Sequence, residues 1–215
     1  MLTVMWTMNT EETQNTQVGL LVVDLQIAVF QSAKIPPADN AEILLRHAQA
    51  LLQAARAAGI PIVHVQHCGA PGEVLEEGAP GWPIYSPLSP LAGEAVLQKR
   101  TSDSFNGTAL HAVLSELGVT SLVVTGIQSE RCVAATCRRA IALGYRVLLA
   151  RDGHSTWPDG SRTAREIIEE QNRDLESSGV ELCDVRALVD GSLAVSNACL
   201  REQLGLGRTA ATITL

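Results

Sequence analysis

The sequence predicts a three-layer α/β/α domain with a mostly parallel central sheet, a Rossmann-like arrangement. Short apolar strands alternate with helical stretches, and the strands are continuously apolar, which is typical of strands covered by helices on both faces. Repeated strand–helix–strand units imply right-handed crossovers and therefore parallel strands. Buried strands are expected at 19–25, 60–66, 121–126, 145–150 and 179–185, with a weaker one at 95–99.

Helices are expected between these strands, where apolar residues recur at helical spacing and glycines follow the last turn, at 40–58, 109–117, 132–143 and 163–177. Asp39 with Glu42, and Thr163 with Glu166, have the spacing of capping boxes. Residues 68–93 are rich in Gly and Pro. A long irregular insertion of this kind predicts a lid or a binding loop.

The domain prediction divides the 215 residues into three parts. Residues 1–17 form a polar N-terminal tail without the pattern of a signal peptide. Residues 18–190 form the folded domain, and residues 191–215 are a C-terminal extension in which a helix is expected at 193–204. The five cysteines are an odd number without a CxxC pair, which favours reduced thiols and a cytoplasmic protein.

The charge of the chain argues against two classes of partner. The formal net charge is −7 and the isoelectric point is near 5.2, and no run of Lys or Arg is present. Nucleic acids and anionic membranes both recruit basic patches. The apolar runs are also too short to span a bilayer. We therefore expect a small-molecule substrate, no nucleic acid and no membrane.

Three reactive side chains follow predicted strands, where ligands bind in open parallel sheets. Asp24 ends the first strand inside an apolar run, and Lys99 ends the weaker strand. Cys132 follows the strand SLVVTG by a short turn and begins a helix. A helix N-terminus offers N–H groups and a positive dipole end, which predicts a lowered thiol pKa and donors for an oxyanion. By this position alone, catalytic and core roles for Cys132 weigh about equally, whereas a core role suits the other cysteines better.

Two further groups of residues have open interpretations. Five of the seven aromatic residues follow predicted strands, which indicates a partly apolar pocket or, with equal weight, ordinary loop packing: Phe30, Trp82, Tyr85, Phe105 and Trp157. His64 and His67 at the exit of the second strand could suggest a metal. They have no nearby carboxylate and no third histidine at matching spacing, so a structural role or a substrate contact is favoured, and no metal or other cofactor is expected.

The order Asp24, Lys99, Cys132 lies in the segments LVVDLQ, VLQKRTSDSFNGTAL, VVTGIQSERCVAATCRRAIALGY and VLLARDGHSTW. This pattern resembles the isochorismatase-like cysteine hydrolases of the isochorismatase/nicotinamidase superfamily, and the resemblance runs over residues 19–185. It implies that Asp24 is the general base, that Lys99 pairs with it, and that Cys132 is the nucleophile. It also implies that the family members form homodimers or homotetramers.

The resemblance further implies a cis peptide between Ile127 and Gln128. The backbone N–H groups of Gln128 and Cys132 would then form the oxyanion hole, and Gln26 would line the substrate pocket. Nicotinamidases of the superfamily carry an Asp-x-His…His metal motif, whereas HVQHCGAPGEV here contains no Asp. Nicotinamidase activity is therefore disfavoured.

Known isochorismate hydrolases of this group cleave a vinyl ether and lack the cysteine, so Cys132 favours carbonyl chemistry. The hypothesis is a hydrolase acting on an amide or another non-peptide C–N bond of a small molecule through a thioester acyl-enzyme. One alternative is a vinyl-ether hydrolase of the isochorismatase type. Another is a non-catalytic binding or redox-sensing protein that uses Cys132 as its reactive thiol.

Overall fold

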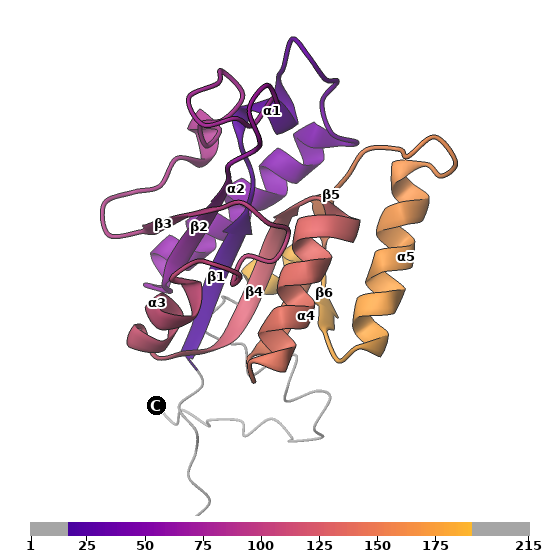
Figure 1. Cartoon of the computed structure of the whole chain (residues 1–215). Coiled ribbons are helices and arrows are strands. Elements are labelled where there is room, and N and C mark those ends of the chain that lie inside the picture. Colours follow the sequence, from indigo (N-terminus) through magenta and orange to yellow (C-terminus); the bar gives the residue numbers. More distant parts are fainter. Residues whose placement is uncertain (1–16, 191–215) are drawn as a thin grey trace, which may run out of the picture.

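The computed structural model describes residues 17–190, and a six-stranded, all-parallel sheet forms their centre (Figure 1). The strand order is β3-β2-β1-β4-β5-β6. The strands are β1 (Gln17–Val23), β2 (Ile62–His67), β3 (Ala95–Lys99), β4 (Val119–Ile127), β5 (Arg146–Ser155) and β6 (Glu181–Cys183). The predicted α/β/α class is confirmed. Gln17, which the sequence analysis placed in the tail, begins β1, and the helix expected at 193–204 lies outside the described residues.

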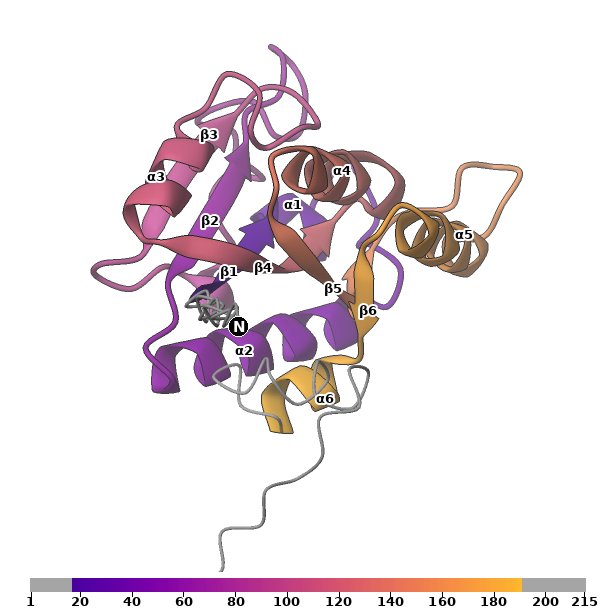
Figure 2. The same cartoon turned by 90° about the horizontal axis from the view of Figure 1, so that it is seen from below.

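Helices cover both faces of the sheet, as Figure 2 shows from below. One face packs against α2 (Ala41–Ala57) and α6 (Val185–Asp190), and the other against α3 (Leu110–Glu116), α4 (Ala134–Ala142) and α5 (Ala164–Ser177). Within β1, Leu20 and Val22 belong to the first core, whereas Leu21 and Val23 belong to the second. This alternation explains why the strands are apolar throughout. None of the helices within residues 17–190 is long and apolar enough to cross a membrane.

The site region lies between the ends of β1 and β4, where the strand order reverses. These two strands are neighbours, but the connection after β1 leads to β2 in one half of the sheet, and the connection after β4 leads to β5 in the other half. A crevice at such a switch point is the usual ligand position in this class of fold. At its base Val23 pairs with Gly126, whose φ is 141°, and a Cβ on Gly126 would collide with the carbonyl group of Val23. Glycine therefore allows the two strand ends to approach closely.

Of three local predictions, the structure confirms one and differs from two. The capping box of Thr163 and Glu166 is confirmed at the start of α5. The capping box of Asp39 and Glu42 is wrong, because α2 begins after Asn40, which has a φ of 49° and makes no side-chain cap. The last strand is shorter than expected, since the chain turns into α6 directly after it.

The insertion at 68–93 is irregular, as predicted, and contains one 3-10 turn at Ser86–Leu88. Side chains outside the insertion hold it at its middle and near its C-terminal end. Gln26 and Gln66 each donate a hydrogen bond to the carbonyl oxygen of Trp82, at 2.6 and 3.0 Å. Near the C-terminal end, the Glu94 carboxylate accepts a hydrogen bond from the backbone N–H of Leu91 at 3.0 Å.

Glu94 is also the centre of a partly buried ionic cluster, which we call the Glu94 clamp and which consists of Arg56, His64 and Glu94. Arg56 Nε and Nη2 donate to the two carboxylate oxygens at 2.7 and 3.0 Å. His64 Nε2 lies 3.0 Å from Oε2. The clamp therefore joins α2, β2 and the end of the insertion, and His64 has a structural role here.

Candidate active site

The central feature of the site is a buried ion pair between Asp24 and Lys99. Asp24 follows β1, with its backbone in the left-handed region at a φ of 56°, a conformation that is uncommon outside glycine and often found at functional positions. Lys99 is the last residue of β3, and its Nζ lies 2.7 Å from Asp24 Oδ2. The side chains are 4% and 0% exposed, so this pair is shielded from solvent. Lys99 Nζ also donates to the carbonyl oxygen of Thr101 at 3.1 Å.

Cys132 and His67 complete the cluster around this pair. Cys132 belongs to a single π turn, Ser129–Val133, which leads directly into α4. Its thiol lies beside the side chains of Asp24 and Lys99, both of which influence its pKa. His67 ends β2, and its Nδ1 lies 3.4 Å from Lys99 Nζ. Oxygen, nitrogen and sulfur atoms of Asp24, His67 and Cys132 all lie within 4.8 Å of one another. The structure thus brings together the three residues predicted as catalytic.

The thiol of Cys132 is a weaker acid than its sequence position suggested. Burial and the negative charge of Asp24 raise the pKa of Cys132 to about 11, although Lys99 opposes this effect. The expectation of a lowered thiol pKa is therefore wrong, because desolvation and a neighbouring carboxylate outweigh the helix N-terminus. The thiol keeps its proton at neutral pH, and it needs a base to become a nucleophile.

Asp24 has the properties of such a base. Burial raises the pKa of Asp24 above its ordinary value, while the charge of Lys99 opposes that rise. Burial would lower the pKa of Lys99, but Asp24 and Cys132 hold it above its ordinary value, so Lys99 remains a cation. Asp24 Oδ1 is buried and has no hydrogen-bond partner within residues 17–190. One oxygen of this carboxylate is thus fixed by Lys99, and the other is available to accept a proton.

A metal ion fits this cluster poorly. Aspartate, histidine and cysteine are suitable zinc ligands. The Lys99 ammonium, however, already lies 2.7 Å from Asp24 and 3.4 Å from His67. A divalent cation bound by these residues would have to lie beside a buried positive charge. The donor set is therefore better suited to proton transfer, with Lys99 as its cation.

The π turn Ser129–Val133, here called the catalytic turn, is supported from the interior by the buried side chain of His154. His154 Nδ1 lies 2.8 Å from Ser129 Oγ, and its Nε2 lies 3.0 Å from Asn172 Oδ1. Asn172 Nδ2 donates to the carbonyl oxygen of Arg151, which fixes the amide so that its oxygen faces the ring. His154 Nε2 therefore carries the proton, and Nδ1 accepts a hydrogen bond from Ser129. Burial lowers the pKa of His154, which favours this neutral form.

A cavity of about 400 Å³, here called the catalytic cavity, opens at Asp24, His67 and Cys132. Its charged and polar lining comprises Asp24, His67, Glu73, Ser102, Gln128, Arg131 and Cys132. The remaining lining is mostly apolar and includes Ala28, Val29, Ile35, Val74, Leu75, Ile127 and Trp157. A cavity of this size accommodates a small organic molecule. The peptide between Ile127 and Gln128 is cis, as the resemblance implied.

Of the six predicted pocket residues, Trp157 alone is among the described lining residues of this cavity. Phe30 and Tyr85 stack on each other with ring centroids 4.5 Å apart. Trp82 Nε1 donates to the sulfur of Cys68 at 3.4 Å. Phe105 is buried in the core on the α3–α4 side, against another aromatic ring. For these four aromatic residues, the alternative of ordinary loop packing describes the structure better.

Gln26 is an anchor and not part of the lining. Its Nε2 donates to the carbonyl oxygens of His67 and Trp82 at 3.0 and 2.6 Å, and its Oε1 accepts from the N–H of His67 at 2.9 Å. Gln26 therefore fixes the backbone of His67 beside Lys99.

His67, for which the sequence favours a structural role or a substrate contact, is among the lining residues. Other lining residues are not predicted by the sequence. Glu73 and Val74 belong to the irregular insertion, and Arg131 belongs to the catalytic turn. In such segments the direction of a side chain is set by packing and not by a periodic pattern.

Comparisons with known proteins agree with this geometry. A family model described as the isochorismatase domain matches residues 18–172. A streptothricin hydrolase of Streptomyces noursei is 45% identical over 139 residues, which cover 65% of this chain and 50% of the relative. N-carbamoylsarcosine amidase of an Arthrobacter species is 26% identical over 152 residues, which cover 62% of this chain and 58% of the relative. The chain thus spans about half the length of the streptothricin hydrolases it matches.

Among solved structures, a protein of the isochorismatase family from Chromobacterium violaceum ATCC 12472 has a TM-score of 0.74 and 29% sequence identity. The match covers 86% of this chain and 96% of that one. The family model and this structural neighbour share one assignment, and the model covers more than half of the sequence. The chain therefore belongs to the isochorismatase family of hydrolases.

Proposed function

We propose that this protein hydrolyses an amide, ureido or similar C–N bond of a small molecule through a thioester at Cys132. The observation that carries the proposal is the contact of one half-buried thiol with Asp24 and Lys99 at the wall of a cavity of about 400 Å³. The names of two relatives, N-carbamoylsarcosine amidase and streptothricin hydrolase, support a hydrolytic reaction and, in the first case, a C–N bond.

The first half of the reaction forms the acyl-enzyme. Asp24 takes the thiol proton through its free oxygen, and the sulfur of Cys132 adds to the substrate carbonyl carbon. The thiol pKa of about 11 means that proton removal and attack must be closely coupled. We assign the backbone N–H groups of Gln128 and Cys132 to the developing oxyanion. The C–N bond then breaks, and Asp24 returns the proton to the leaving nitrogen.

The second half of the reaction releases the acid product. Asp24 removes a proton from water, the resulting hydroxide adds to the thioester carbonyl, and the C–S bond breaks with the proton returning to sulfur. Lys99 keeps its positive charge throughout and stabilises whichever of Asp24 and Cys132 is anionic. The two steps thus use one base twice, and they consume one water molecule per bond cleaved.

The proposal is tested by a screen of small amides and ureido compounds, with mass spectrometry of the intact protein to detect acylated Cys132. Cys132→Ala should abolish turnover and the acyl adduct. Cys137→Ala is a matched control, because Cys137 is buried in α4, away from the cavity. A Cys132→Ala protein that hydrolyses these substrates at the wild-type rate would refute the mechanism.

The same experiment separates the two alternatives. A vinyl-ether hydrolase would keep its activity after Cys132 is alkylated with iodoacetamide. A redox sensor would show peroxide-dependent oxidation of Cys132 but no acyl adduct with any amide or ureido compound. The prediction of a homodimer or homotetramer is tested separately by size-exclusion chromatography with light scattering.

A further inference from the structure

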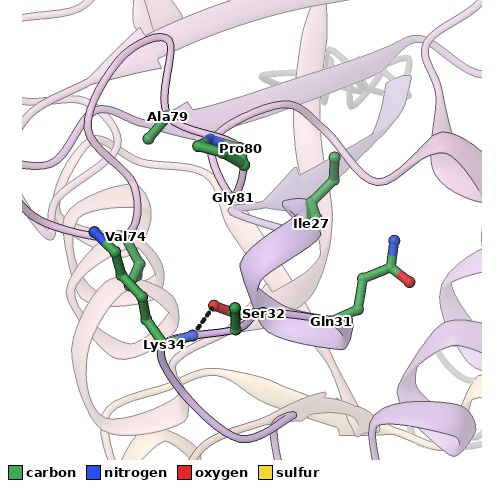
Figure 3. Close-up of a pocket in the computed structure, with 9 residues that line it drawn as sticks. Ile27, Gln31, Ser32, Lys34, Val74, Ala79, Pro80 and Gly81 are labelled. Carbon is green, nitrogen blue, oxygen red and sulfur yellow. Dashed lines mark hydrogen bonds between the residues drawn. The ribbon is translucent and has the colours of Figure 1, made fainter.

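A second cavity, of about 460 Å³ (Figure 3), shares the lining residue Val74 with the catalytic cavity. We call it the α1 groove, because it lies between the short helix α1 (Ile27–Phe30), the segment that follows α1, and the insertion. Its described lining residues are Ile27, Gln31, Ser32, Ala33, Lys34, Val74, Ala79, Pro80 and Gly81. None of the residues that the resemblance assigned to catalysis belongs to it.

The two cavities share one wall. Val74 lines both of them, and α1 contributes Ile27 to the groove but Ala28 and Val29 to the catalytic cavity. The insertion is tightly seated on α1 at this point: Ala28 N–H donates to the carbonyl oxygen of Gly81 at 3.0 Å, and a Cβ on Gly81 would lie 2.9 Å from that of Ala28. The α1 groove is therefore the neighbouring space for a ligand that extends from Cys132 past Val74.

The chemistry of the groove is apolar with one positive charge. Ile27, Ala33, Val74, Ala79 and Pro80 supply most of its walls, and its lining contains no acidic residue of the described chain. Lys34 is one of only two lysines in a sequence of net charge −7.

Unlike the other lysine, Lys34 forms no ion pair with a carboxylate in residues 17–190. The Lys34 side chain is exposed, and Figure 3 shows it extending toward Val74. An apolar groove beside a cation that has no carboxylate partner is complementary to an apolar chain with an anionic end.

We infer that the α1 groove is a second subsite for the substrate of Cys132, and that it binds an apolar chain ending in a carboxylate. This inference rests on the proposed function. The reacting carbonyl lies at Cys132, the chain passes over Val74, and the carboxylate pairs with Lys34. The substrate class is thus an amide or ureido compound that carries an extended ω-carboxylate.

The experiment measures alkylation of Cys132, which needs no turnover. Chloroacetamides with N-alkyl chains of increasing length, each with a terminal carboxylate or a terminal methyl group, are compared by intact-protein mass spectrometry. Each methylene that enters the groove should raise the second-order rate constant about three- to fourfold. The carboxylate should add up to about fivefold over the methyl end.

Two variants test whether Lys34 causes the effect of the carboxylate and whether the α1 groove causes the effect of chain length. Lys34→Gln should remove the carboxylate advantage and keep the effect of chain length, whereas Ala79→Trp, which fills the groove, should bring the ratio of long-chain to unsubstituted probe close to one. Arg186→Gln, a matched loss of an exposed cation on α6, should keep both effects. The inference would be overturned if the alkylation rate did not depend on chain length, or if it did not depend on the carboxylate. It would also be overturned if the advantage of the carboxylate survived in Lys34→Gln.

The outcome also distinguishes the inference from the proposed function. Labelling that depends on chain length, without any acyl-enzyme in the amide screen, would refute hydrolysis and leave the subsite intact. An acyl-enzyme formed equally well from short and long substrates would refute the subsite alone. A Cys132 that none of the chloroacetamides labels would overturn both.

Discussion

The Asp24–Lys99 pair is a buried ionic cluster and the Glu94 clamp a partly buried one, and their carboxylates differ in one respect. Both oxygens of Glu94 are engaged, by Arg56, His64 and the N–H of Leu91. Only one oxygen of Asp24 is engaged, by Lys99, and the other has no partner among the described residues. Burial acts against ionisation in both. The hydrogen bonds to Glu94 nevertheless bring its pKa to about 2, whereas the pKa of Asp24 is raised.

This difference separates a structural carboxylate from a reactive one. A fully hydrogen-bonded carboxylate stays ionised and holds its neighbours in place. A carboxylate with one free oxygen and a raised pKa can accept and return a proton near neutral pH. The number of engaged oxygens therefore identifies the base in this molecule better than burial does, since both acids are buried. The comparison leads to four predictions.

The largest expected effect is on activity. Asp24→Asn keeps the size of the side chain and tolerates the left-handed backbone, but it removes the base. We expect kcat/KM on a substrate from the amide screen to fall about 10³-fold, in the middle of the range for general acid–base catalysis. The matched variant Glu94→Gln should keep kcat/KM within about twofold at a temperature where it is folded. Equal losses in the two variants would contradict the distinction.

The next effect is on stability. Glu94→Gln leaves Arg56 as a cation without its partner and weakens the attachment of the insertion. We expect the free energy of unfolding, measured with urea at pH 7, to fall by about 2 kcal/mol, as when a partly buried donor loses its acceptor. A loss below about 1 kcal/mol would mean that the clamp is not a structural element.

A smaller effect of opposite sign is expected when the catalytic pair is replaced as a whole. The double variant Asp24→Asn with Lys99→Met removes two buried charges and keeps the volume of the side chains. We expect it to be more stable than the wild type by about 1–2 kcal/mol, because the desolvation of both charges is no longer required. A less stable double variant would show that the pair is retained for the fold and not for the reaction.

The smallest effect concerns the thiol. In the wild type, the rate of alkylation by unsubstituted chloroacetamide should rise with pH toward the thiol pKa of about 11. Asp24 raises that pKa and Lys99 lowers it, so Asp24→Asn should move the midpoint down by about one pH unit. At pH 8 the variant would then be alkylated faster than the wild type while its amide turnover is lost. A midpoint that is unchanged or higher would contradict the assigned contact between Asp24 and Cys132.

The sequence was sufficient to place the three predicted catalytic residues at one edge of the sheet. Asp24, Lys99 and Cys132 each follow a strand, and the carboxyl ends of parallel strands meet at the same edge. Which strands are neighbours is not visible in the sequence. The reach of Lys99 from the edge strand, past the end of β2, to Asp24 became clear only in the structure.

Packing accounts for the predictions that failed. Phe30 and Phe105 follow strands just as Trp157 does, but their rings stack on those of Tyr85 and Tyr145 and do not face the cavity. The thiol pKa was predicted from the helix N-terminus alone, without the burial and the carboxylate that the tertiary structure adds. Both errors concern distances between segments far apart in the chain, which periodicity and local motifs do not encode.

The attachment of the insertion has a consequence for protein engineering. Gln26 and Gln66 hold its middle at Trp82, and Glu94 holds its C-terminal end at Leu91, and all three side chains lie outside residues 68–93. Each of these contacts, like the hydrogen bond from Ala28 to Gly81, uses a main-chain group of the insertion, so the attachment does not depend on the side chains at those positions. Since the insertion supplies Val74 to both cavities, we expect its replacement as a cassette to change substrate preference and to leave the Asp24–Lys99 pair in place.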